Sequence, residues 1–336
     1  MEEQQKRLVV SILAYAAQRG LSVAQLCRLT GIDLDALKRD REIIIEPQQV
    51  ETLWKEAIHL SEDPLFGLHF GESLQLSALG IVGEIIKSSP TVGDALTQAA
   101  SLATRVTDLI RMEITRGKKS FTIEFVPTAS GEQQQFTITF RQMLDFLMVF
   151  TIHELDGLLL ERIVPNAVKY LVAINDAAEY ERVLRCPVKK AKVCVLEFDN
   201  RYWQEPVISA NHELQRSLLA KVQSATPGAQ SLKSRIYTYL MSNSYLGIRS
   251  LEDVAANFHI SSRSLQRKLQ EEGTSYLELS DAVRKSLAVH YIRSGSYQLK
   301  EISGMLGYNE LSAFTRAFKR WTGKAPVHYQ AESAAS

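Results

Sequence analysis

The residues best suited to chemical recognition lie in two segments of the C-terminal third that repeat one another. Side chains that donate hydrogen bonds recur there at helical spacing: Arg263, Gln266 and Arg267 in the first segment, and Ser312, Thr315 and Arg316 in the second. Arginine pairs with guanine through two hydrogen bonds, and glutamine pairs with adenine in the same way. These residue types at this spacing predict contacts with base edges in a major groove of DNA.

Each segment is predicted to be the second helix of a helix-turn-helix, preceded by a shorter helix and a tight turn. The first unit runs through helix 251–258, turn 259–261 and helix 262–269, and the second runs through helix 299–306, turn 307–309 and helix 310–321. Matching residues lie 48 positions apart before the turn, as in Ala255 and Ser303, and 49 apart after it, as in Arg267 and Arg316. The second unit therefore has one more residue than the first between these two pairs of matching positions, which we place in its turn.

Side chains of suitable size stand where a helix-turn-helix needs them. Small residues, Ala255 and Ser303, allow the second helix to cross the first closely. The turn needs a residue that tolerates a positive φ, and we expect His259 and Gly307 in that role. The apolar residues predicted to hold the two crossings are Val254, Phe258, Ile260, Leu265 and Leu269 in the first unit and Ile302, Leu306, Tyr308, Phe314 and Phe318 in the second.

One continuous helix, Tyr276–Arg293, is predicted between the two units, with Leu279, Val283, Leu287 and His290 facing inward. At ~1.5 Å per residue it spans roughly 27 Å, close to the ~34 Å of one turn of DNA. Two recognition helices held that far apart would enter successive major grooves on one face of the duplex.

The net charge of +1 conceals an uneven distribution along the chain. Residues 231–336 hold 14 Lys and Arg against 9 Asp and Glu, a net charge of +5, and the rest of the chain carries −4. A basic C-terminal third predicts an anionic partner. Phosphate contacts are expected at Ser261, Lys268, Lys319 and Arg320, with plain surface charge as the alternative for the three basic residues.

Residues 231–330 resemble the DNA-binding domain of AraC/XylS-type transcription regulators, in which a linker helix joins two helix-turn-helix units. The resemblance is carried by 261–269, by Ile302-Ser303 with Leu306-Gly307-Tyr308, and by 314–323 with Pro326 behind it. It implies base contacts at the six hydrogen-bonding positions named above. Leu311 stands where the family often has a polar contact residue, which predicts weaker base recognition by the second unit.

Residues 1–224 show the pattern of an α+β domain, and the chain beyond them shows that of an all-α domain. The first hundred residues have helical periodicity; strands are then predicted at 109–114, 120–126, 167–174 and 192–198, and helices at 133–156 and 177–184. The stretch 225–231 is predicted to be a linker before a DNA-binding domain at 232–330. A helix at 211–223 is expected either to form a dimer seam or to pack on its own domain.

The N-terminal part resembles the sensor domain of one branch of this family, in which the domain is arabinose-binding-like and of the ornithine-regulator type. Three stretches carry the resemblance: Leu79–Gly83, Ser88–Leu96 and Leu196–Asp199. It implies that residues 1–224 bind a small-molecule effector. Candidate effector-binding residues are Arg105, Arg111 and Arg141, which suit an anionic group, together with Tyr170 and Trp203, and each has a structural role as its alternative.

Other classes of function lack the residues that they need. The three cysteines, Cys27, Cys186 and Cys194, show neither metal-binding nor disulfide spacing, and the last two are expected in the core. The sequence contains no phosphate-binding glycine loop, zinc-protease motif or nucleophile elbow, so we expect no enzyme, cofactor or metal site. Because no apolar stretch reaches the ~20 residues of a membrane span and no secretory signal is evident, we expect a cytoplasmic protein.

The expected partners are double-stranded DNA and a small-molecule effector, with RNA polymerase and a second copy of the chain left open. Two other functions remain compatible with the sequence. In one, the basic helical domain engages a protein partner and the N-terminal domain is purely structural. In the other, an N-terminal enzyme is fused to a DNA-binding domain.

Overall fold

The computed structural model describes residues 2–38, 44–134, 137–159, 161–171, 174, 176–207, 231–244, 248–294 and 297–334. The chain divides into two compact units, residues 1–213 and 214–336. The predicted helix at 211–223 and nearly all of the predicted linker at 225–231 lie outside the described residues. The domain boundaries expected from the sequence therefore stay predictions.

Within its described residues, the N-terminal unit contains a five-stranded sheet in the order β1-β2-β5-β3-β4. The strands are β1 (Ile110–Arg116), β2 (Ser120–Pro127), β3 (Ala167–Tyr170), β4 (Val188–Lys190) and β5 (Cys194–Asp199). Neighbouring strands are antiparallel except β3 and β4, which are parallel. The four predicted strands are confirmed, although the one expected at 167–174 ends at Tyr170, and β4 was not predicted.

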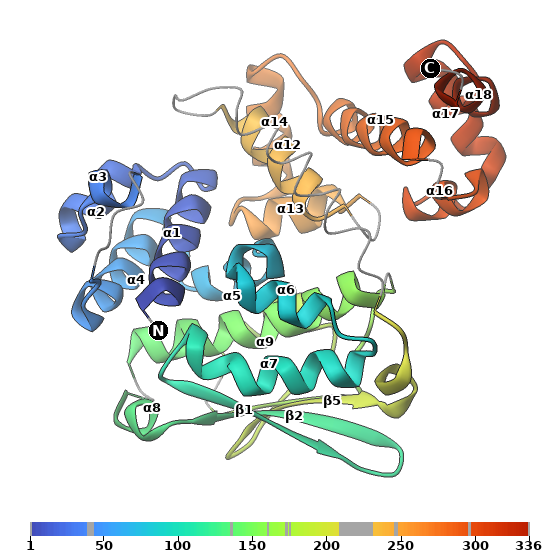
Figure 1. Cartoon of the computed structure of the whole chain (residues 1–336). Coiled ribbons are helices and arrows are strands. Elements are labelled where there is room, and N and C mark those ends of the chain that lie inside the picture. The colour runs from blue at the N-terminus through green and yellow to red at the C-terminus, as the bar shows by residue number, and fades with distance from the viewer. Residues whose placement is uncertain are drawn as a thin grey trace. The chain divides into compact units, whose positions relative to one another are not determined.

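The interior strand β2 shows why one face of the sheet is covered. Phe121, Ile123 and Phe125 are buried, whereas Thr122 and Glu124 between them are partly exposed. Successive side chains of a strand point to opposite faces, so the buried set lies on one side. Figure 1 shows α7 (Val92–Val106) and α9 (Ile138–Leu159) lying over one face of the sheet. This layered arrangement of helices on a sheet is the α+β architecture expected from the sequence.

The other helices of the N-terminal unit are mostly short. They are α1 (Glu2–Gln18), α2 (Val23–Thr30), α3 (Leu34–Lys38), α4 (Pro47–Ser61), α5 (Phe66–Ser73), α6 (Ile81–Lys87), α8 (Ala129–Gln134) and α10 (Ala177–Leu184), with the 3-10 helices η1 (Leu76–Leu79) and η2 (Asn200–Gln204). Ser22, Thr91 and Asp176 begin three of the helices by accepting a hydrogen bond from a backbone N–H of the first turn. The helix predicted at 133–156 is confirmed as α9, which begins at Ile138.

Helices α5 and α9 cross at two glycines that lie one helical turn apart on α5. A Cβ on Gly67 would lie 2.4 Å from the carbonyl oxygen of Gln142, and a Cβ on Gly71 would lie 2.8 Å from that of Phe146. The Gln142 side chain then ties the two helices together, because its Oε1 accepts from the Gly67 N–H (2.5 Å) and its amide donates to the Pro64 carbonyl (3.0 Å). This close backbone contact positions α9 against the rest of the unit.

The described residues of the C-terminal unit contain helices and no strand. The helices are α12 (Leu232–Ser242), α13 (Leu251–Asn257), α14 (Ser262–Glu271), α15 (Tyr276–Ser294), α16 (Leu299–Met305), α17 (Leu311–Thr322) and α18 (Pro326–Ala334). Figure 1 shows α13 and α14 near one end of α15 and α16 to α18 near the other. Leu279, Val283 and Leu287 of α15 are buried as predicted, while His290 is only half-buried. No helix in the described part of either unit is long and apolar enough to cross a membrane.

The α5–α9 crossing predicts that Gly67→Ala lowers the free energy of unfolding of the N-terminal unit by about 1–3 kcal/mol, because the added methyl group overpacks a backbone contact. Urea unfolding measures this change. The matched control is Gly304→Ala in α16, where a Cβ meets nothing within 4 Å and stability should be unchanged or slightly higher. A Gly67→Ala protein as stable as the wild type would contradict the crossing.

Candidate nucleic-acid interface

The two helix-turn-helix units of the C-terminal domain share one turn structure. His259 and Gly307 both have a positive φ, 52° and 80°, as the sequence predicted. In the first unit the Ile260 N–H donates to the Ala255 carbonyl (2.9 Å), and in the second the Tyr308 N–H donates to the Ser303 carbonyl (3.0 Å). The same backbone hydrogen bond thus closes both turns, with the small residue of the first helix as its acceptor.

Both units also begin and pack in the same way. The first helix of each unit starts with a reciprocal pair of capping hydrogen bonds, between Ser250 and Asp253 in α13 and between Gln298 and Glu301 in α16. The predicted apolar residues are buried except Ile260 and Tyr308, which are partly exposed. The second helices, α14 and α17, are therefore held with one fixed face inward.

The outward faces of α14 and α17 carry the side chains predicted to contact bases. In α14, Arg263, Gln266 and Arg267 are exposed, and Arg267 lies 3.9 Å from Glu271 on the next turn. In α17, Ser312 and Arg316 are exposed. Thr315 differs, because it is half-buried and its hydroxyl donates to the Leu311 carbonyl (2.8 Å). The structure thus presents five of the six side chains to solvent, and base contact stays a prediction for all six.

The four predicted phosphate-contacting residues lie in different settings. The Ser261 hydroxyl caps α14 by accepting from the Ser264 N–H (3.2 Å). Lys268 and Lys319 are exposed, whereas the exposed Arg320 pairs with Asp281 of α15 (2.6 Å). Lys268 and Lys319 are therefore the simpler candidates, because a phosphate contact by Arg320 would compete with an existing ion pair.

Leu311 is 40% exposed in the first turn of α17. The sequence predicts weaker base recognition there, because an aliphatic side chain cannot form a hydrogen bond with a base. An apolar side chain in a major groove still contacts the methyl group of thymine. The exposure of Leu311 is compatible with such a contact.

The five candidate effector-binding residues of the N-terminal unit do not meet in one pocket. Arg105 is exposed and lines a broad cleft of about 600 Å³ beside α1, α4 and the start of α9. Arg111 is exposed on the edge strand β1, where its guanidinium donates to Glu113 (2.8 Å) and to the Pro127 carbonyl (3.1 Å). Trp203 packs edge-on against Phe121, with ring centroids 5.1 Å apart.

Tyr170 and Arg141 belong instead to a polar cluster around Asp145 of α9. The buried Asp145 accepts hydrogen bonds from the hydroxyls of Tyr170 and Tyr180. Burial raises the pKa of the Asp145 carboxyl to about 6 against the opposing effect of these hydrogen bonds and of the nearby Arg141. Effector binding stays a prediction for all five residues.

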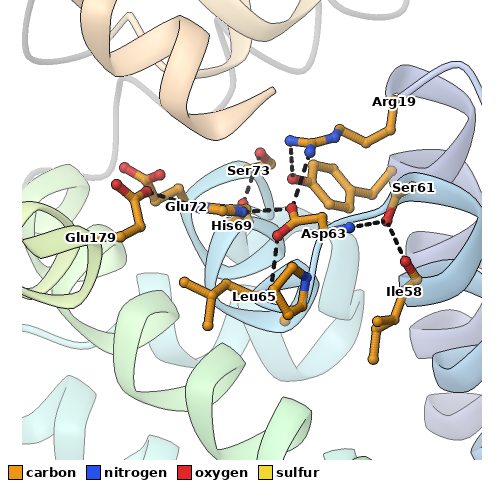
Figure 2. A network of polar contacts seen from close by, with 12 residues as sticks. Arg19, Ile58, Ser61, Asp63, Leu65, His69, Glu72, Ser73 and Glu179 are labelled. Atoms are coloured by element: carbon orange, nitrogen blue, oxygen red, sulfur yellow. Dashed lines mark hydrogen bonds and ion pairs between the residues drawn. The ribbon is translucent and has the colours of Figure 1, made fainter. Parts of the chain in front are cut away.

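Sequence reasoning missed a second buried polar network, centred on His69 of α5 (Figure 2). The His69 Nδ1 lies 2.7 Å from an oxygen of Asp63, and its Nε2 lies 2.8 Å from one of Glu179 in α10. Arg19, which follows α1, also pairs with Asp63 (3.0 Å). Nothing local in the sequence connects Asp63 to Glu179, so the pattern of residues could not predict this network.

Charge compensation in this network is close to complete. Arg182 of α10 pairs with Glu72 and with Glu179, both at 2.7 Å. Burial lowers the pKa of His69, but the hydrogen bonds to Asp63 and Glu179 outweigh burial, so its pKa is raised. Burial raises the pKa of Glu179, and hydrogen bonds from His69 and Arg182 outweigh it, so that pKa is lowered. No group of histidines, cysteines and carboxylates in the described chain has the geometry of a metal site.

Comparisons with known proteins match both units. Residues 20–207 match the arabinose-binding domain of AraC transcription regulators, and residues 254–332 match a helix-turn-helix domain. The ornithine utilization regulator of Pseudomonas aeruginosa is 28% identical, over 81% of this chain and 80% of that protein. The regulator VqsM of the same species is 22% identical, over 87% of this chain and 93% of that protein. Among solved structures, the transcriptional regulator CdpR of Pseudomonas aeruginosa matches 88% of this chain and 95% of its own. The two are 22% identical, and the TM-score is 0.41.

The raised pKa of His69 predicts a stability difference that depends on pH. The imidazolium stabilises the folded unit fully below about pH 6.5, the pKa of an unfolded histidine, and this stabilisation is lost as the pH rises through the higher folded pKa. Replacing His69 removes one partner of buried ion pairs, so His69→Gln should cost about 3–5 kcal/mol at low pH and less at high pH.

Urea unfolding of the wild type and of His69→Gln over a pH series measures this difference, and titrating groups that do not contact His69 cancel between the two proteins. The exposed His59 of α4 supplies the control, because His59→Gln should have a small effect at every pH. A cost for His69→Gln that is constant across the series would refute the charged state of His69.

Proposed function

The chain belongs to the AraC family of transcription regulators, and on this basis we propose how it contacts DNA and how it is controlled. It is a DNA-binding transcription regulator with an arabinose-binding-like N-terminal domain. In the proposal, α14 and α17 enter successive major grooves, and a small-molecule effector bound in the N-terminal unit changes the affinity for the operator. We propose no enzymatic activity for the chain. Its proposed location is the cytoplasm, where it binds DNA.

The repetition of one helix-turn-helix structure at two places supports the DNA-contact proposal. Both turns close with the same hydrogen bond, and both second helices carry an exposed arginine at the matching position, Arg267 and Arg316. The intervening helix α15 has 19 residues. At ~1.5 Å per residue it is roughly 28 Å long, near the ~34 Å that separates successive major grooves on one face.

Control by an effector is supported by the family of the N-terminal unit. An effector changes transcription only if it binds one state of the protein better than another. One relative is named an ornithine utilization regulator, so amino acids belong among the first compounds to test. RNA polymerase and a second copy of the chain are further proposed partners.

The DNA-contact proposal predicts that Arg267→Ala and Arg316→Ala each weaken specific binding by about 1–3 kcal/mol, because each removes a bidentate contact to a base. The operator is first obtained by selecting duplexes from a random pool with the full chain. Binding to the selected duplex is then measured for each variant at one fixed salt concentration.

Two controls separate base recognition from charge. Arg28→Ala removes an exposed arginine from α2 of the N-terminal unit and should leave DNA affinity unchanged. Lys268→Ala should weaken binding to all sequences alike and reduce the salt dependence by about one counterion. Unchanged affinity in the double variant Arg267→Ala/Arg316→Ala would overturn the proposal in favour of a protein partner for this domain.

The effector proposal predicts that one compound in a panel of amino acids including ornithine, fatty acids and cyclic nucleotides stabilises the N-terminal unit. At about 100 times its Kd, a ligand adds about 2.7 kcal/mol to the free energy of unfolding. A thermal-shift screen of the full chain detects such a change as a rise in Tm. If no compound raises the Tm, a role in dimerisation or protein contact replaces effector binding for this unit.

A further inference from the structure

A cavity of about 70 Å³ lies within the N-terminal unit, between η1, α6, α7, β1 and α9. Two stretches that carry the family resemblance supply part of its wall, through Leu79 and Val82 in one and Ala95 and Leu96 in the other. The whole lining is aliphatic or aromatic except for two side chains of α9, Thr151 and Glu154.

These two polar side chains differ in their hydrogen bonding. The Thr151 hydroxyl donates to the Leu147 carbonyl (2.8 Å), so its proton is already used within α9. Glu154 is only 4% exposed, and neither of its carboxylate oxygens has a hydrogen-bond partner of ordinary geometry among the described residues. A buried carboxylate with so few donors around it is costly, so Glu154 can still accept hydrogen bonds from a ligand on an otherwise apolar wall.

The nearby charged groups are already engaged elsewhere. Lys87 of α6 pairs with Glu84 (2.8 Å), and Asp156 of α9 pairs with Arg185 (2.5 Å). Burial raises the pKa of the Glu154 carboxyl to about 8; the Leu76 backbone N–H and Lys87 oppose this effect, and Asp156 adds to it. The lining residues on η1, α7 and β1 are uncharged.

We propose that this cavity binds a short aliphatic amine, with its ammonium group against Glu154 and its alkyl group against the apolar wall. An ammonium group has three N–H donors and no acceptor, so it suits a buried carboxylate that has, among the described residues, only the Leu76 backbone N–H as a neighbouring donor. The free carboxyl avoids the cost of an isolated buried charge by staying protonated, and the ammonium group supplies the counter-charge when the carboxyl ionises in the complex.

The cavity sets the size of the ligand. Its volume is about half of the ~150 Å³ in which an apolar engineered cavity holds benzene, which leaves room for roughly three to four non-hydrogen atoms. n-Propylamine is therefore a suitable probe. A ligand of this size reaches a Kd of roughly tens of micromolar at best, so a titration to ~10 mM covers the expected range.

Binding should be coupled to the protonation of Glu154. At neutral pH the amine is charged and the free carboxyl is mostly protonated, so complex formation releases about one proton. The affinity should therefore rise roughly tenfold per pH unit from about pH 6 until the free carboxyl ionises. The charged groups that act on the Glu154 carboxyl are Lys87 and Asp156, and each of them is held in an ion pair.

Isothermal titration calorimetry of the full chain with n-propylamine tests the proposal. We expect one saturable site, proton release measured in buffers of different ionisation enthalpy, and at least tenfold weaker binding of n-propanol, which has the same shape without the charge. No saturable binding, or equal binding of n-propanol, would overturn the proposal.

Variants locate the site. Glu154→Gln keeps the shape of the protonated side chain and should abolish both amine binding and proton release. Glu154→Leu should do the same while raising the Tm, because an apolar side chain suits the wall. Thr151→Val is the matched control on the same wall and should bind the amine as the wild type does. Amine binding by Glu154→Gln at wild-type strength would overturn the assignment.

If an amine in this cavity is the effector, that role rests on the proposed function. The binding of the amine to the cavity does not depend on it. The calorimetric titration uses no DNA, and the Arg267→Ala and Arg316→Ala measurements use no amine. A failure of one proposal is therefore distinguishable from a failure of the other.

Discussion

Helix α9 lies in the interior of the N-terminal unit along most of its length, so most of its polar side chains cannot reach water. Each of them needs a partner inside the protein. Gln142 satisfies this requirement by holding the first turn of α5, Asp145 by accepting hydrogen bonds from two tyrosines, and Asp156 by its ion pair with Arg185. Through these partners one helix organises α5, α10 and the strand β3. The α+β fold depends on this internal pairing as much as on its apolar core.

Pairing is incomplete in α9 for Glu154, for the Thr139 hydroxyl and for one oxygen of Asp145, and of these three residues only Glu154 lines the cavity. In the sequence, Glu154 is one of three polar residues that interrupt an apolar run, together with His153 and Asp156. Only the packing of α6 and α7 around it turns an interruption into an acceptor on a cavity wall. The pairing rule and the position of the cavity together point to Glu154 as the residue of our ligand-binding proposal.

The C-terminal unit uses its helices in the opposite way. Leu265 and Leu269 fix one face of α14, and Phe314 and Phe318 fix one face of α17, while most side chains on the opposite faces are exposed. Side chains on the free face can therefore serve recognition without loss of stability. Most of this arrangement was predictable, because a helix-turn-helix is specified within about 20 residues by the spacing of apolar residues and by one positive φ.

The buried polar contacts of the N-terminal unit were less predictable, because they join residues that lie far apart in the sequence. Helix positions, strand alternation, caps and the repeated unit follow from the sequence alone, because they depend on neighbours a few residues apart. The contacts of Gln142 with Gly67 and of His69 with Glu179 join residues 75 and 110 positions apart. No local pattern encodes such a pair, and so Arg105 and Tyr170 were grouped from residue type although they lie in different surroundings. The sequence by itself determined the elements and the DNA-recognition repeat; the tertiary structure alone decided which buried charges meet and which one faces a cavity.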